Sequence, residues 1–438
     1  MTGRWTGLQL RHSRLGQNIV ANYLAVVWLG ALSLLLIPVY LRLLGPQQWG
    51  LVAVCMTLQA VWGLLDAGLG QIMPRDVARA QGDRAALARI YRLYASAYGV
   101  LGLAGMALGQ LAVGWLAGSW VQAEGLAATQ IEWALRLVLL QFMFQFANQA
   151  ATGYWSGTEQ QARLNVRQCA FATLKHGTAL AGVAWWRADA LGYLTGFVLW
   201  SMLEWAWNRR AVWRQLGHQG VGDVQAAELL GLARQAGVLA AGVLIGMLVS
   251  QVDRLVLSRI VDVTAFGRYA IAVQLGLALL QLQYPLMRAY FPRVVRDDAQ
   301  GRCNQSLRQL GMALLVLCAL PCAGLALFAP WLLQHWLGDP RVAADVAAPL
   351  RLILLAVVLN AAYHVIYQRM LVRGASMQIV RINSVALLCV LAWLPLAAER
   401  FGIVAGGGAW VLVSLVQLTL GGWWWRQQDS PRSGVREP

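Results

Sequence analysis

The stretch from Asn18 to Arg79 reads NIVANYLAVVWLGALSLLLIPVYLRLLGPQQWGLVAVCMTLQAVWGLLDAGLGQIMPRDVAR. It holds two apolar runs, 18–41 and 48–70, joined by a short polar turn that contains Gly45 and Pro46. Each run is long enough to cross a hydrocarbon core of about 30 Å. The stretch therefore predicts a hairpin of two transmembrane helices.

The rest of the chain repeats this pattern. Of 438 residues, 59% are hydrophobic and 12% are charged, whereas a soluble domain carries about 25% charged residues. The further apolar runs are 92–116, 130–153, 165–186, 188–208, 236–258, 265–288, 309–334, 345–368, 381–398 and 401–424. Their length, and the absence of strict alternation, favour helices over barrel strands. The sequence predicts an all-α polytopic membrane protein of about twelve transmembrane helices.

The basic residues indicate an orientation. The net charge is +16, and most arginines lie in alternate links between apolar runs, on one side of the predicted membrane. Because cytoplasmic loops carry the excess of Lys and Arg, we expect both termini in the cytoplasm and the first run as a retained span. A nucleic-acid site would instead gather the charge on one soluble face, so no nucleic acid is expected as a partner.

An internal repeat divides the chain. Equivalent features recur 217 or 218 residues apart, in the pairs Gly50 and Gly267, Pro74 and Pro292, Gly157 and Gly374, Asn165 and Asn383. The longest link without an apolar run, 209–235, lies near the middle. We therefore predict two six-helix halves, 1–215 and 216–438, with parallel orientation and a central cavity between them.

Several short motifs resemble a known family. They are Asn18 and Asn22, the segment Ile37 to Tyr40, Leu44-Gly45 with Gly50, Leu65-Asp66-Ala67-Gly68-Leu69, Val252 to Leu257, and Phe266 to Ala270. This pattern is similar to the polysaccharide and O-antigen flippase family of the multidrug/oligosaccharidyl-lipid/polysaccharide exporter superfamily. The resemblance covers most of the chain, and its motifs are structural rather than catalytic.

The resemblance implies a carrier rather than an enzyme. It would move an undecaprenyl-pyrophosphate-linked oligosaccharide from the inner to the outer leaflet of the bacterial inner membrane. Its partners would be that lipid-linked oligosaccharide, membrane lipids, and a glycan polymerase or other glycan-assembly proteins. No cofactor is expected.

Lys175 is the deepest basic residue, near the middle of the fifth apolar run. An ionisable side chain at this depth costs about 2.5–3.5 kcal/mol on insertion, so it needs a wet cavity or a partner. We expect either a cation that contacts an anionic pyrophosphate-sugar, or an interhelical ion pair with Glu204. The sequence leaves both open.

Three further candidates lie in the two predicted hairpins. Asp253 and Arg254 are adjacent on the seventh run, so they point about 100° apart, and at least one is expected to face the cavity. The alternative is interhelical pairing. Asp66 ends the second run and is either a helix-end residue, also able to pair with Arg75 or Arg79, or a gate contact.

The remaining candidates are arginines near the ends of runs. Arg136 follows Glu132 by four residues, which favours a local ion pair but leaves Arg136 as a substrate-binding candidate. Arg288 and Arg369 end the eighth and tenth runs. They are either orientation signals or part of a basic rim that attracts an anionic headgroup.

Other function classes fit less well. A membrane glycosyltransferase or polymerase needs catalytic carboxylates or a large loop, and the loops here are short. No Gly-rich phosphate loop is present, which argues against an ATP-driven pump. The six cysteines are expected to be apolar fillers rather than metal ligands. A drug or cation antiporter of the same superfamily stays open, with Asp66, Glu204 and Asp253 as candidate coupling carboxylates.

Overall fold

The computed structural model describes residues 14–66, 68–217, 224–300 and 302–429, without the side chains at 14–20, 238–241, 243, 288–289, 292, 299 and 429. All the regular elements in these ranges are helices. The contacts between residues divide the chain into two compact units, Met1–Leu244 and Ile245–Pro438. The predicted boundary at 215/216 separates the first six helical passages from the next six. It is a different kind of division from this one and stays a proposal.

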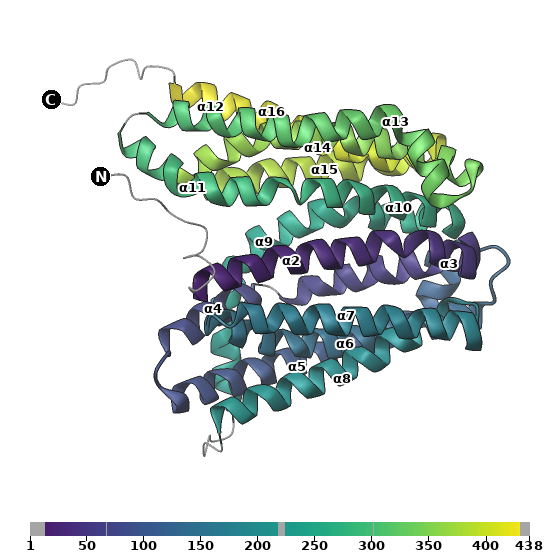
Figure 1. The fold of residues 1–438 in the computed structure, drawn as a ribbon, viewed down its shortest axis with the longest axis horizontal. Coiled ribbons are helices and arrows are strands. Elements are labelled where there is room, and N and C mark those ends of the chain that lie inside the picture. The colour runs from purple at the N-terminus through teal and green to yellow at the C-terminus, as the bar shows by residue number, and fades with distance from the viewer. Residues whose placement is uncertain (1–13, 67, 218–223, 301, 430–438) are drawn as a thin grey trace. The chain divides into compact units, whose positions relative to one another are not determined.

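The N-terminal unit holds six helical passages within the described residues. Its elements are α2 (Arg14–Leu35), α3 (Ile37–Trp62), η1 (Gly63–Asp66), α4 (Leu69–Arg79), α5 (Arg84–Trp115), η2 (Leu116–Trp120), α6 (Ala128–Gly157), α7 (Gln161–Ala181), η3 (Gly182–Trp186) and α8 (Ala190–Leu216). Figure 1 shows α5, α6, α7 and α8 running alongside one another, and α6 contacts the other three.

The hairpin at the start of the chain turns at Gly45, as its sequence predicts. Gly45 has φ 77° and ψ 166° and interrupts α3 just before Pro46. The positive φ is a conformation that glycine adopts without a steric penalty. The second passage is then broken by η1, and Gly68, with φ 87°, starts α4.

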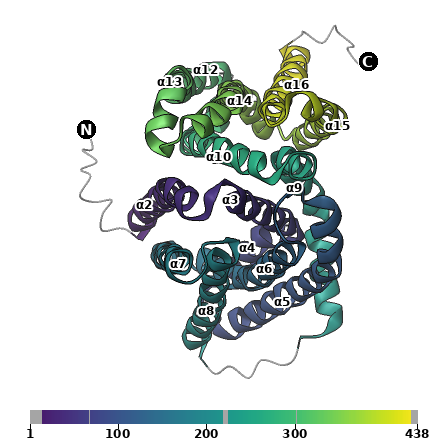
Figure 2. The ribbon, with the colours of Figure 1, turned by 90° about the vertical axis from the view of Figure 1, so that its right-hand side faces the viewer.

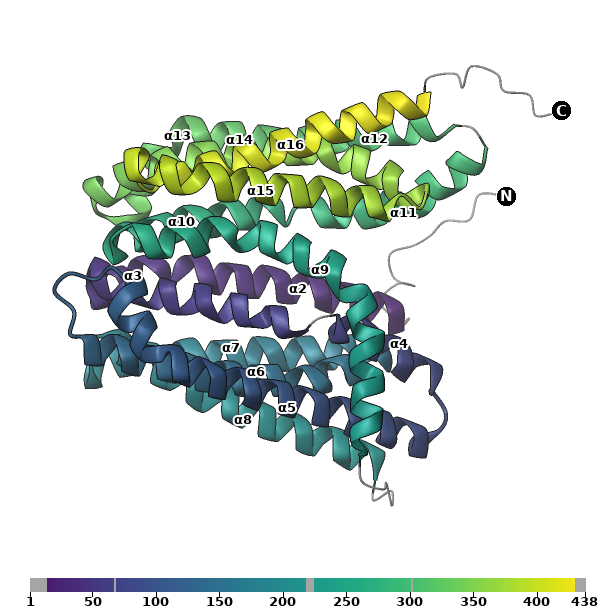
Figure 3. The same cartoon turned by 180° about the vertical axis from the view of Figure 1, so that it is seen from behind.

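The C-terminal unit repeats this order. The elements after α8 are α9 (Ala226–Ile260), α10 (Val263–Leu280), α11 (Gln283–Ala299), α12 (Cys303–Leu314), η4 (Leu315–Ala319), α13 (Leu320–Leu337), α14 (Pro340–Val372), α15 (Ser376–Phe401) and α16 (Val404–Asp429). The first part of α9, up to Leu244, belongs to the N-terminal unit. The break between α10 and α11 lies where the offset of 217 places the counterpart of η1. α14 is central, with α13 and α16 on either side in Figure 2, and α15 runs beside α16 in Figure 3.

Together these passages confirm the predicted all-α membrane architecture of about twelve helices. In the described part of the chain, seven helical segments are long and apolar enough to cross a membrane. The passages α6, α7 and α8 fall short of that composition, and they carry the buried polar residues Gln141, Lys175 and Glu204. Their lower hydropathy reflects polar groups that face the protein interior.

Glycines allow the closest helix contacts in the N-terminal unit. A Cβ on Gly109 would lie 2.4 Å from Leu139 of α6, and one on Gly157 would lie 2.6 Å from the Pro74 carbonyl oxygen of α4. The small-residue spacings Gly105/Gly109 and Gly153/Gly157 therefore mark real helix approaches. Gly246, in the C-terminal unit, does not mark a close helix contact, because a Cβ there would meet nothing within 4 Å.

Four aspartates begin helices as N-caps. Asp83 accepts hydrogen bonds from the backbone N–H groups of Ala85 and Ala86 at the start of α5. Asp189, Asp262 and Asp339 do the same for α8, α10 and α14. These side chains satisfy N–H groups that have no partner within the helix, so part of the small acidic content of the chain serves local structure.

Candidate functional site

Lys175 of α7 forms a buried ion pair with Glu204 of α8. The Nζ–Oε2 distance is 2.6 Å, and the two side chains are 11% and 9% exposed. Asn148 of α6 donates to Glu204 Oε1 at 3.4 Å, and Asn208 donates to Asn148 at 3.0 Å. Lys175 thus has the interhelical partner, Glu204, that the sequence left as one of two alternatives. The two opposite charges give the pair no net charge.

A chain of amides continues this network towards α3. Gln59 donates to Gln145 Oε1 at 2.6 Å, and Gln145 donates to the Ser201 hydroxyl at 3.4 Å. Ser201 precedes Glu204 by about one helical turn of α8, so both sets of bonds meet on the same helix. The arrangement links α3, α6, α7 and α8 through polar groups in the interior of the unit.

His176, next to Lys175, points into a separate aromatic cluster. Its Nδ1 lies 3.0 Å from the hydroxyl of Tyr40, which is 1% exposed. Tyr40 also packs edge-on against Tyr193, with ring centroids 4.9 Å apart. The cluster ties the start of α3 to α7 and α8.

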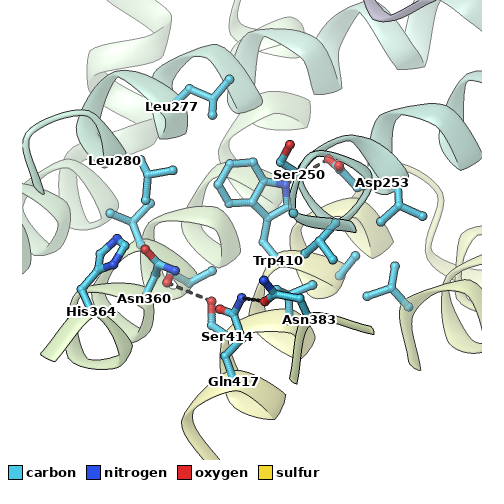
Figure 4. Close-up of a pocket in the computed structure, with 18 of the residues that line it drawn as sticks. Ser250, Asp253, Leu277, Leu280, Asn360, His364, Asn383, Trp410, Ser414 and Gln417 are labelled. Carbon is cyan, nitrogen blue, oxygen red and sulfur yellow. Dashed lines mark hydrogen bonds between the residues drawn. The ribbon is translucent and has the colours of Figure 1, made fainter. Parts of the chain in front are cut away.

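The C-terminal unit contains a cavity of about 240 Å³. Its lining comes from α9, α10, α11, α14, α15 and α16, and Figure 4 shows the labelled side chains around it. The polar members are Ser250, Asp253, Asn360, His364, Asn383, Trp410, Ser414 and Gln417. The site is therefore lined by helices of one unit and mixes apolar walls with polar groups.

Asp253 lines this cavity and is 3% exposed. Its Oδ2 accepts hydrogen bonds from the Tyr269 hydroxyl at 2.5 Å and from Trp410 Nε1 at 3.0 Å. These two donors hold a carboxylate that would otherwise be costly to bury. Arg254 is not part of the cavity lining; its Nη2 donates to the Ser250 carbonyl oxygen at 2.8 Å.

Two buried polar atoms of cavity residues have no hydrogen-bond partner among the described residues. They are Gln417 Oε1 and His364 Nδ1. The Nε2 group of Gln417 donates to Asn383 at 3.0 Å, and Ser414 donates to the Ala356 carbonyl oxygen at 3.2 Å. A buried polar atom without a partner costs about 1–3 kcal/mol, so these two atoms are an energetic cost in the wall of the cavity.

Asp66 has a helix-end role. Its carboxylate accepts the Gly70 N–H at 3.2 Å and the Tyr98 hydroxyl at 2.7 Å. Among the described residues no ion pair joins it to Arg75 or Arg79; Arg75 lies 3.5 Å from Asp76 instead. A gate function of Asp66 remains a proposal.

The three other arginines lie in different surroundings. Arg136 pairs with Glu132 at 3.3 Å, lies over the Trp133 ring, and is 45% exposed. Arg369 is 2% exposed, with its guanidinium 4.1 Å from the centroid of the Trp425 ring. Arg288 lies in α11, but its side chain falls outside the described residues. Within each unit, the described candidates have different partners.

Solved structures share this fold. A lipid II flippase, MurJ, in an inward closed conformation matches 93% of this chain and 87% of its own, with a TM-score of 0.74 and 10% identity. An inward-facing multidrug resistance MATE family transporter matches 94% of both chains, with a TM-score of 0.66 and 14% identity. A MOP superfamily transporter from Pyrococcus furiosus matches 98% of both chains, with a TM-score of 0.60 and 13% identity.

The chain has the fold of the MOP superfamily transporters. At 10–14% identity these matches show the fold alone. No protein-family model matches the sequence, and no curated protein does. The MOP fold agrees with the superfamily that the sequence motifs resemble.

The cavity lining was the main feature that the sequence reasoning missed, apart from Asp253. Its polar members recur at helical spacing inside apolar runs: Asn360 and His364 in α14, and Trp410, Ser414 and Gln417 in α16. Spacings of three and four residues put such side chains on one helix face. That periodicity was the available signal, since ionisable residues alone indicate only Asp253 of this lining.

Proposed function

We propose that this chain is a membrane transporter that flips undecaprenyl-pyrophosphate-linked oligosaccharide, such as O-antigen or polysaccharide repeat units, across the bacterial inner membrane. The observation that carries the proposal is the MOP fold over nearly the whole chain, together with the motifs that resemble the polysaccharide flippase family. One neighbour with this fold is a lipid II flippase. Both termini are placed in the cytoplasm by the asymmetry of the arginines.

A drug or cation antiporter is the second candidate, because MATE transporters share the fold equally well in coverage. Coupling to a cation needs a carboxylate that can exchange its partners. Here Glu204 is paired with Lys175, Asp253 accepts from two donors, and Asp66 accepts from Gly70 and Tyr98. These bonds favour the flippase over the antiporter. A glycosyltransferase or polymerase is the least supported class.

In the proposed cycle the substrate meets polar groups of the helical passages. The substrate-binding candidates remain Lys175, Asp253, Arg254, Arg136, Arg288 and Arg369, with Asp66 as the gating residue. Of these, Asp253 has the strongest support, because it lines a cavity. The glycan polymerase and other glycan-assembly proteins are proposed as partners that receive the flipped product.

Deletion of the gene in its own host tests the proposal. We expect lipid-linked repeat units to accumulate on the inner leaflet and surface glycan to be lost, both restored by the wild-type copy. Normal surface glycan in the deletion strain would contradict flipping. Unchanged glycan together with a new sensitivity to cationic drugs would support the antiporter instead.

A further inference from the structure

We propose that the cavity of the unit Ile245–Pro438 binds one pyranose ring of the transported glycan. The inference rests on the proposed function and adds to it a place for a sugar. It is argued from the size of the cavity, from the hydrogen-bonding groups left open in it, and from the aromatic side chains of its wall.

The size of the cavity fits one ring. Its volume of about 240 Å³ corresponds to about eight water molecules at ~30 Å³ each. That space is smaller than a typical drug-sized pocket of about 300–1,000 Å³ and far larger than a single dehydrated ion. One six-membered sugar ring fits this volume.

The open hydrogen-bonding groups call for hydroxyls. Gln417 Oε1 accepts hydrogen bonds and His364 Nδ1 accepts in one of its tautomers, and both atoms are buried in the wall without a partner among the described residues. Asn360 also lines the cavity and makes no hydrogen bond to another described residue; its amide both donates and accepts. A hydroxyl group does both as well, so a ring with several hydroxyls matches this set of groups.

The wall contains two aromatic side chains held in place. Trp410 is anchored through Nε1 to Asp253, and Figure 4 shows its indole ring in the centre of the lining. Tyr284 packs against His364 with ring centroids 6.3 Å apart. A fixed indole offers an apolar face with little loss of rotamer freedom, and the C–H face of a pyranose is a suitable partner for it.

A cation is a poorer occupant. Asp253 is the one carboxylate among the lining residues, and both of its hydrogen bonds are to the same oxygen, supplied by Tyr269 and Trp410. No group of three or more metal-ligating side chains occurs in the described part of the chain. A bound cation prefers several oxygen ligands that together carry negative charge, and this lining offers one carboxylate, Asp253, beside neutral amides and an imidazole.

The test uses the full-length protein in lipid nanodiscs and saturation-transfer NMR with methyl glycosides of glucose, galactose, N-acetylglucosamine and rhamnose. We expect saturation transfer to at least one glycoside and none to cyclohexanol, a six-membered ring with a single hydroxyl. Asn360→Leu and Gln417→Met should each weaken binding about tenfold, as expected for the loss of one hydrogen bond inside a site.

Matched controls separate the site from general effects. Asn304→Leu and Gln334→Met make the same changes at exposed positions of this unit outside the cavity, and they should bind as the wild type does. Gly246→Leu adds a side chain at a lining position where a Cβ meets nothing within 4 Å. It should block binding without disturbing packing, which keeps the test decisive if an amide variant fails to fold.

Two outcomes would overturn the inference. One is that no glycoside receives saturation from the wild type, and the other is that the signal persists in Gly246→Leu and in both amide variants. The deletion experiment is independent of these. If the deletion strain accumulates lipid-linked units but no glycoside binds, the sugar site fails and the flippase stands. If glycosides bind but surface glycan is normal, the flippase fails and the site stands.

Discussion

The two units use the same order of helices for different polar chemistry. In the N-terminal unit, Lys175, Glu204, Asn148 and Asn208 bond to one another across three helices. In the C-terminal unit, polar side chains within several helices surround a cavity, and two of their atoms have no partner among the described residues. The contrast shows that a repeated fold does not carry a repeated function. The N-terminal network also contains an unpaired buried atom, Asn208 Oδ1, so the two units differ in the presence of a cavity rather than in the pairing of every polar atom.

The largest effect is expected from breaking the ion pair. Lys175→Met leaves Glu204 as an unpaired buried charge and should lower the free energy of unfolding by about 3–5 kcal/mol. The double variant Lys175→Met/Glu204→Leu should regain most of that loss, because neither charge remains. Equilibrium unfolding in detergent micelles measures both.

Transport then decides what the pair is for. Lys175→Ala should lose complementation of the deletion strain, and Lys175→Arg should keep much of it. If the double variant is stable and complements, the pair is structural and the contrast between the units holds. A stable double variant that does not complement would show that Lys175 meets the substrate, which would break the contrast.

The next-largest loss of stability is expected when the Asp253 carboxylate in the cavity loses a hydrogen-bond donor. Tyr269→Phe removes a donor from Asp253 and should cost about 1.5–3 kcal/mol, the range for a hydrogen bond to a charged group. Tyr367→Phe is the matched control, because that hydroxyl makes no hydrogen bond to a described residue. Equal losses in the two variants would mean that the Tyr269–Asp253 bond adds nothing to stability.

Packing around the same carboxylate gives a third test. A Cβ on Gly406 would lie 2.4 Å from the Tyr269 ring and 2.5 Å from Leu257, so Gly406→Ala should cost about 1–3 kcal/mol. Gly246→Ala places its methyl group in open space and should leave stability unchanged or raise it by up to about 1 kcal/mol. Thermal unfolding of the two variants side by side tests whether the cavity is as open as its lining indicates.

The smallest effect is expected at the exposed pair of α6. Arg136→Ala removes an ion pair of which the Arg136 side chain is 45% exposed, and the loss in stability should stay below about 0.5 kcal/mol. A clear fall in transport with unchanged stability would identify Arg136 as a substrate contact. It would also show that the N-terminal unit has a polar group that contacts a ligand. That result would contradict the contrast between the bonded network of the N-terminal unit and the cavity of the C-terminal unit.

Several features of the fold follow from local sequence. The twelve apolar runs, the turn at Gly45-Pro46 and the aspartate N-caps are recognisable because each depends on neighbouring residues only. The offset of 217 residues likewise anticipates the matching breaks in the second passage of each unit. The choice between pairing and substrate contact at Lys175 did not follow, because it depends on where Glu204 lies 29 residues away.

The sequence by itself determined the class of the protein, its span number and its repeat, because hydrophobic length and glycine or proline breaks act within one helix. Only the tertiary structure decided which polar groups are satisfied. Asp253 is held by residues 16 and 157 positions away, Tyr269 and Trp410, and the open acceptors of Gln417 and His364 lie on different helices. Hydrogen bonds between helices depend on packing and orientation, and these are properties of the assembled bundle rather than of any segment.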